Sequence, residues 1–130
     1  MSRFKYIRAD VYRRGITIFI GPKKDLPTFV KKAFKGNKTL LESIKDSLKE
    51  DSLGTTYHED FGQSLIWIPK WPKTPKELGT LAHEILHATM NMLDYIDVEY
   101  RYGGPNEPYT YLFEFLFTEA LEEKGYEKVE

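Results

Sequence analysis

The residues of this sequence best suited to chemistry lie in the short segment His83–His87, which reads His-Glu-Ile-Leu-His. Two histidines at this spacing project from the same face of an α-helix, about 6 Å apart along its axis. Both imidazoles can therefore bind one zinc ion, with nitrogen–zinc distances of about 2.0–2.1 Å. The spacing predicts that His83 and His87 are two ligands of a single Zn²⁺ ion.

Glu84 follows the first histidine directly, so a helix turns its side chain about 100° away from the line joining the two imidazoles. From there a carboxylate can reach a metal-bound water without becoming a ligand. Zinc lowers the pKa of such a water towards neutrality, and a neighbouring carboxylate can accept the released proton. We therefore expect Glu84 to be the general base for hydrolysis of a peptide bond, and to pass the proton to the leaving amine.

The third metal ligand is expected to be a carboxylate. A catalytic zinc usually has three protein ligands and one open position, and no histidine follows His87. Glu107 is favoured because it begins the last predicted helix, after a loop long enough to reverse the chain. Glu114 lies two turns further along that helix and is the alternative. The weaker candidates are Asp94, Asp97, Glu99 and Glu119.

The segment that carries the histidines falls within the best-marked helix of the chain, predicted to run to about Ile96. Thr74 and Glu77 form a capping box, and Pro75 occupies the first helical position. An apolar stripe with helical spacing follows, so one face of this helix should be buried. Its members are Leu78, Ala82, Ile85, Leu86, Thr89, Leu93 and Ile96.

The last helix is predicted from about Asn106 to Glu123. Its middle, Tyr111–Phe117, is almost entirely apolar, so we expect this helix to be largely buried. The polar segment Glu122–Glu130 is expected to be a frayed tail.

The first part of the chain predicts a hairpin of two strands, Phe4–Val11 and Ile16–Ile20. Two helices should follow, beginning near Asp25 and Thr39. Two further short strands are expected, at residues 54–60 and 63–67. The fold class is therefore α+β: a small twisted, mostly antiparallel sheet of three to five strands, packed on helices within one domain of residues 1–130.

The composition of the 130 residues is that of a soluble globular protein, with 41% hydrophobic and 30% charged residues. Cysteine is absent, which excludes disulfides, thiolate zinc sites, iron–sulfur clusters and cysteine nucleophiles. Nineteen basic residues face 20 acidic ones, a net charge of −1, so neither nucleic acid nor a membrane is an expected partner. The first residues do not read as a signal peptide, and we expect a cytoplasmic protein.

The two predicted helices together resemble the gluzincin branch of zinc metallopeptidases. The run Asn106–Leu112 (NEPYTYL) resembles the third-ligand helix of the ImmA/IrrE-like peptidases and of small phage-encoded proteins with the same motif. The resemblance covers roughly residues 65–121. It implies a zinc peptidase whose ligands are His83, His87 and Glu107 and whose general base is Glu84.

The same resemblance implies that an edge strand of the sheet binds an extended peptide, and it places that strand at Gln63–Ile68. The expected partner is accordingly a peptide or protein substrate. This kind of peptidase often stabilises the developing oxyanion with a tyrosine or histidine, and the candidates here are Tyr102, Tyr109 and Tyr111.

Two other functions are compatible with the sequence. The chain could be a zinc-binding interaction or regulatory module without protease activity, with a metal closed by four protein groups, for example by addition of His58. It could also be an interaction domain that binds no metal.

Overall fold

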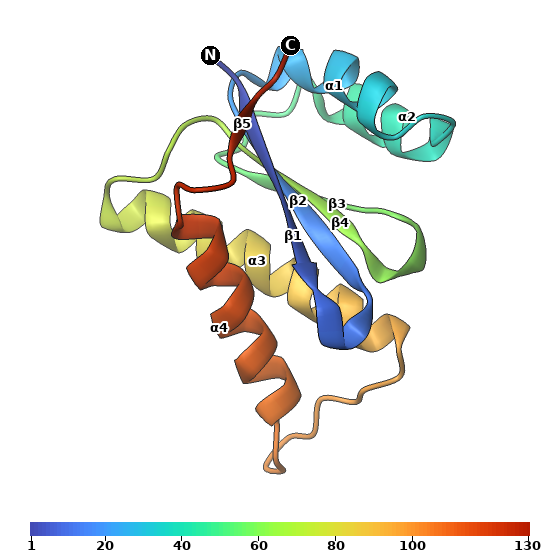
Figure 1. Ribbon diagram of the computed structural model, residues 1–130, viewed down its shortest axis with the longest axis vertical. Helices are drawn as coiled ribbons and strands as arrows, with labels where there is room; N and C mark the ends of the chain where they lie inside the picture. Colours follow the sequence, from blue (N-terminus) through green and yellow to red (C-terminus); the bar gives the residue numbers. More distant parts are fainter.

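The computed structural model describes residues 1–130 and contains four α-helices and one five-stranded sheet (Figure 1). The strands are β1 (Arg3–Ala9), β2 (Arg14–Ile20), β3 (Thr55–His58), β4 (Ser64–Ile68) and β5 (Glu127–Lys128). The helices are α1 (Leu26–Ala33), α2 (Lys38–Ser47), α3 (Pro75–Tyr95) and α4 (Glu107–Leu121). The predicted α+β class is confirmed, with a strand number at the upper end of the expected range.

The strand order is β3-β4-β2-β1-β5, and every neighbouring pair is antiparallel except β2 and β4. That parallel pair exists because α1, α2 and β3 separate the two strands along the chain. The placement of the edge strand at Gln63–Ile68 is therefore wrong, because β4 is hydrogen-bonded on both sides. The edge strand at this end of the sheet is β3.

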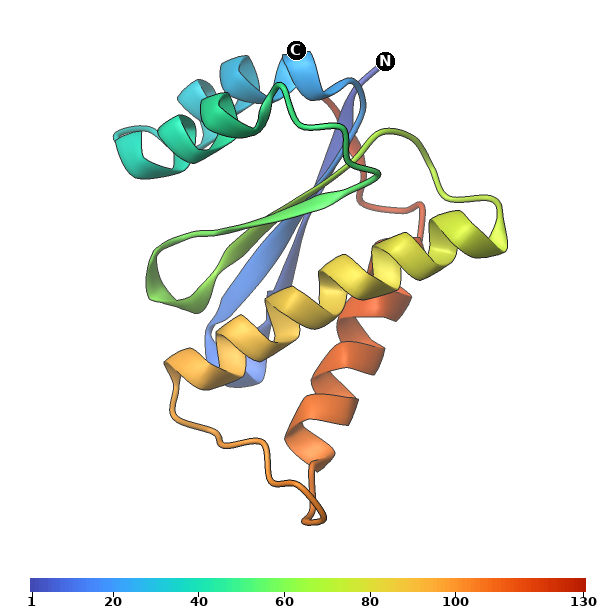
Figure 2. The same cartoon turned by 180° about the vertical axis from the view of Figure 1, so that it is seen from behind.

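Helices cover both faces of the sheet, and the strand sequences show why. In β2, Ile16 and Ile18 belong to the hydrophobic core beneath α3 and α4, whereas Phe19 belongs to the core beneath α1 and α2. Successive residues of a strand point to opposite faces, so an apolar run supplies both cores at once. In Figure 2 the sheet accordingly runs between the α1–α2 pair and the α3–α4 pair.

The start of α3 follows the sequence prediction. The backbone nitrogen of Glu77 donates to Thr74 Oγ1 at 3.1 Å, and the Glu77 carboxylate accepts from the backbone of Thr74, which completes the capping box. Hydrogen bonds from the backbone of Lys73 and from the side chain of Lys70 lower the pKa of Glu77 to about 2. The helix is thus fixed at its first turn, two turns before the histidines.

The packed face of α3 differs from the predicted stripe at one important position. The buried apolar side chains are Leu81, Ile85, Ala88, Met92 and Leu93. Leu86 was expected among them but is 47% exposed. It lies on the side of α3 that turns away from the sheet and towards α4.

Helix α4 is not largely buried, so that prediction is wrong. Only the stripe Tyr109, Leu112, Leu116 and Ala120 is buried. Tyr111 and Phe115 are 67% and 42% exposed, and Glu114 between them is also exposed. The apolar run contained more hydrophobic residues than one packed face can hold. None of the helices combines the length and apolar composition needed to cross a lipid bilayer.

The C-terminal segment is ordered rather than frayed. Residues Glu127–Lys128 pair with the start of β1 as β5, and the backbone nitrogen of Val129 donates to the carbonyl of Ser2. Tyr126 anchors the segment because its hydroxyl donates to the carbonyl of Ala120 at 2.7 Å. The end of the chain therefore holds the end of α4 against the sheet.

Lys5 joins the first strand to the last helix and gives a test of this arrangement. Its buried ammonium donates to the carbonyls of Glu119 and Glu122 at 2.7 and 3.0 Å, at the C-terminal end of α4. Lys5→Met keeps the volume but leaves two carbonyls without a donor. We expect it to lower the free energy of unfolding by about 1–3 kcal/mol in urea denaturation.

Lys32→Met is the matched control, because the exposed Lys32 also donates to one backbone carbonyl, that of Glu130. Its loss should change the free energy of unfolding by no more than about 0.5 kcal/mol. Equal effects of the two substitutions would contradict the structural role given to Lys5.

Candidate metal centre

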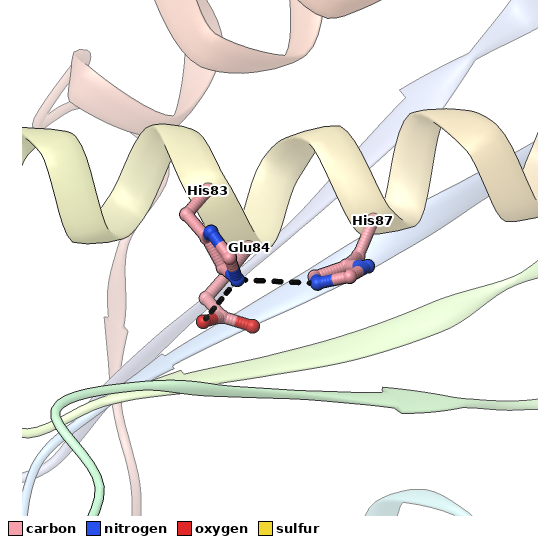
Figure 3. A group of neighbouring side chains, drawn as sticks. All are labelled: His83, Glu84 and His87. Atoms are coloured by element: carbon pink, nitrogen blue, oxygen red, sulfur yellow. Dashed lines mark hydrogen bonds and ion pairs between the residues drawn. The ribbon is translucent and has the colours of Figure 1, made fainter.

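His83 and His87 point to the same side of α3 and face each other (Figure 3). Their Nε2 atoms are 3.2 Å apart. Two ligand nitrogens bound to one tetrahedral zinc at about 2.05 Å would be separated by about 3.3 Å. The two imidazoles thus already have the spacing of ligands to a single ion, as the sequence predicted. Without an ion, the same distance corresponds to a hydrogen bond from one ring to the other.

Glu84 completes this cluster from the buried side of the helix. Its residue is 7% exposed, and its Oε2 lies 4.0 Å from His83 Nε2. The other oxygen, Oε1, is 2.7 Å from the hydroxyl of Thr56 on the edge strand β3. One carboxylate oxygen is therefore hydrogen-bonded to the protein, and the other lies on the side of His83. The ligand atoms of His83, Glu84 and His87 all lie within 4.8 Å of one another.

Gly54 explains how β3 comes so close to this carboxylate. A Cβ atom at Gly54 would lie 3.0 Å from Thr80 Cγ2 and 3.3 Å from Glu84 Cγ. The bare backbone before β3 thus packs directly on α3. Neither Gly54 nor Thr56 was a candidate from the sequence, because nothing in the sequence around a lone glycine or a strand threonine indicates which helix it will contact.

His58, the remaining histidine of the chain, also lies near this cluster. It lines a groove together with His87, and its Nδ1 is 3.3 Å from Ser64 Oγ on the neighbouring strand. Burial, together with the charge of His87, lowers the pKa of His58. Both effects favour the neutral form of the His58 ring. It is not part of the group of ligand atoms formed by His83, Glu84 and His87.

Neither Glu107 nor Glu114 contributes an atom to that group, and both side chains are exposed. On α4, Thr110 is the polar residue that lines a groove together with His83. Glu107 precedes Thr110 by three residues and Glu114 follows it by four, so each is one helical turn away along α4. The assignment of Glu107 as third ligand, with Glu114 as its alternative, stays a prediction.

Two of the weaker candidates for the third metal ligand lie near His87, in a groove that does not include His83. Asp94 and Glu99 line the groove that contains His87 and His58. Together with burial, these two carboxylates raise the pKa of Tyr109, which lines the same groove. Glu99 belongs to the loop between α3 and α4, so it adds a loop carboxylate to the possible ligands.

The tyrosines predicted to stabilise an oxyanion have different surroundings. The hydroxyl of Tyr109 donates to the carbonyl of Val98 at 2.6 Å, so its proton is already used. Tyr102 and Tyr111 are exposed and line none of the grooves beside the histidines. Tyr100, which the sequence did not single out, packs on Tyr109 with a ring-centroid distance of 5.2 Å and lines two of these grooves.

Comparison with known proteins yields no matching family model, no matching curated protein and no matching solved structure. Any functional assignment therefore depends on the geometry of the side chains.

Zinc binding gives the first test of this centre. Titration of zinc into the metal-free protein should raise its melting temperature, since a ligand at 100 times its dissociation constant stabilises the native state by about 2.7 kcal/mol. His83→Ala and His87→Ala should each abolish the increase. His58→Ala should retain it, and loss of the increase in that variant would show that His58 is a ligand.

The third ligand can be identified by comparing Glu107→Gln, Glu114→Gln and Glu99→Gln. We expect Glu107→Gln to weaken zinc binding by more than about tenfold, because even changes to groups that only support a ligand have effects of that size. Isothermal titration calorimetry measures the three affinities. A similar loss in Glu114→Gln or Glu99→Gln, with Glu107→Gln unaffected, would contradict the assignment of Glu107.

Proposed function

We propose that this chain is a zinc-dependent metallopeptidase that hydrolyses peptide bonds with Glu84 as general base. One observation carries the proposal: two imidazole nitrogens 3.2 Å apart, with a free carboxylate oxygen 4.0 Å from one of them. The resemblance of the sequence to gluzincins points to the same chemistry.

The donor set suits zinc. Two neutral imidazoles with a carboxylate as the third ligand are typical of catalytic zinc sites, and the chain contains no thiolate that would favour a different metal. His83 and His87 would hold the ion, with Glu107 as the expected third ligand. A bound zinc ion would supply the positive charge that acidifies a water molecule and polarises the substrate carbonyl.

Glu84 is arranged to move a proton rather than to hold the metal. The hydroxyl of Thr56 donates to Oε1, and Oε2 accepts no hydrogen bond and lies 4.0 Å from His83 Nε2. In that position Oε2 can accept a proton from an attacking water and return it to the leaving amine. Because Thr56 belongs to the edge strand, β3 orients the base as well as bordering the site.

The free edge of β3 supports a peptide as the substrate. An extended chain can add to an unpaired sheet edge through main-chain hydrogen bonds, independently of its side chains. Because β3 is the edge strand beside α3, a peptide bound along it would pass in front of His83 and His87. This role, first given to Gln63–Ile68, moves to Thr55–His58.

Glu84→Gln tests the mechanism, because the amide keeps the shape and cannot accept a proton. We expect zinc affinity to be retained and hydrolysis of an unstructured protein such as casein to fall by about 10²–10⁴-fold. Glu123→Gln, an exposed change in the C-terminal segment, serves as the control and should leave hydrolysis unchanged. Undiminished hydrolysis by Glu84→Gln would contradict the mechanism.

The position of His58 favours a second candidate function, a zinc-binding module without peptidase activity. His58 and His87 line one groove, so a fourth protein ligand is available nearby. A zinc ion with four protein ligands has no open position for water. X-ray absorption of the zinc-loaded protein distinguishes the two functions: three imidazoles support the closed module, and two support the peptidase.

A further inference from the structure

Besides the groove at His87 described above, two grooves border the histidine cluster at His83. The first, which we call the β3 groove, has a volume of about 410 Å³ and lies between α3 and the segment before β3, where it includes Gly54, Thr80 and Glu84. The second, the α4 groove, has a volume of about 580 Å³ and lies between α3 and α4. Gly79 and His83 line both grooves. Whatever fills one groove therefore adjoins the other at His83.

The α4 groove is lined mainly by apolar side chains. His83 is the one ionisable group besides the tyrosines, and Thr110 is the other polar residue; the apolar lining is Ala82, Leu86, Met90, Tyr100, Tyr109 and Phe113. Leu86 and Met90 are 47% and 49% exposed, although they lie within α3 between its buried residues. With no Asp, Glu, Lys or Arg in the lining, this groove is suited to an uncharged apolar group.

Gly79 lies on the border of α3 that the two grooves share. It lies in the interior of α3, where glycine is less favourable than alanine by about 1 kcal/mol. Its backbone is helical, and a Cβ atom there would meet nothing within 4 Å, so neither backbone strain nor a close contact requires glycine. The missing side chain instead keeps this border of α3 low, one turn before His83.

We propose that the α4 groove receives a large apolar side chain of the peptide substrate, with the peptide backbone lying in the β3 groove. The side chain would pass over Gly79 and belong to a residue next to the bond under attack, because the grooves join at His83. The preferred substrates would then carry Phe, Tyr, Leu or Met at that position. This inference rests on the proposed peptidase function and specifies its substrate class.

Peptide binding to the Glu84→Gln protein tests the inference without any cleavage. The probes are pools of unstructured peptides of degenerate sequence with one fixed central residue: Phe, Leu, Ala or Glu. Calorimetry on the zinc-loaded protein should show the Phe and Leu pools binding at least about tenfold more tightly than the Ala and Glu pools, as expected for burial of one large apolar side chain. Equal affinities, or no binding of any pool, would overturn the inference.

Gly79→Leu places a large side chain on the border between the two grooves and should abolish the preference for Phe and Leu. The variant should fold well, because leucine is a good helix former and its Cβ meets no neighbour. Thr118→Leu is the matched control: it adds the same side chain at an exposed position of α4 outside both grooves. A preference for Phe and Leu that persists in Gly79→Leu would contradict the proposed path of the side chain over Gly79.

Leu86→Lys and Phe115→Lys form a second matched pair, since both replace a half-exposed apolar residue on a helix. Only Leu86 lines the α4 groove, so only its substitution should lower affinity for the Phe pool. If Leu86→Lys instead changed the oligomeric state in sedimentation and left peptide binding intact, a second copy would be the occupant, and the inference would be wrong.

Failure of this inference and failure of the peptidase function give different results. If all pools bind equally and cleavage depends on Glu84, the apolar specificity is wrong and the peptidase function is supported. If the Phe pool is preferred but the native protein cleaves no peptide, the peptidase function is wrong and the α4 groove is supported as a binding site.

Discussion

The hydrogen bond between Thr56 and Glu84 is the contact on which the candidate site depends. A carboxylate only 7% exposed is unfavourable unless it is partnered, and Thr56 satisfies one of its oxygens. The contact also fixes the edge strand against α3, with Gly54 allowing the close approach. The second carboxylate oxygen accepts no hydrogen bond from the protein and lies 4.0 Å from His83 Nε2 (Figure 3). The fold thus leaves one acceptor free beside His83, where the proposed hydrolysis would need a base.

Local sequence signals predicted the elements that are fixed locally. The start of α3 was predictable because the capping box of Thr74 and Glu77 uses only neighbouring residues. The predictions failed where distant parts of the chain compete for one surface. The apolar run of α4 predicts burial on all sides, yet α3 and the sheet cover only one face, which leaves Tyr111 and Phe115 exposed. The pairing of β5 with β1 has no local signal either, since Glu127 and Lys128 are polar and exposed.

The candidate site also combines features fixed by neighbouring residues with features fixed by distant parts of the chain. The convergence of His83 and His87 follows from helical periodicity alone, so the sequence was sufficient. The contributions of Thr56, Gly54 and Tyr100 arise from strand order and helix crossing, which no spacing in the sequence encodes. Strand order also explains why the edge strand is β3 and not, as the sequence had predicted, β4. The proposed third ligand is likewise not encoded by spacing in the sequence, because its identity depends on the angle and register at which α4 and its preceding loop meet α3.

The pairing of β5 with β1 has a consequence for the order in which the molecule opens. Closing a loop of nearly the whole chain is entropically costly, and this closure is supported by a two-residue ladder of exposed residues. Among the parts of the sheet, amide hydrogens there should exchange with solvent first, long before those of β2 and β4 at its centre. Local opening would then begin at β5, the edge of the sheet far from β3. Glu84, His83 and His87 would keep their arrangement while β5 separates from β1.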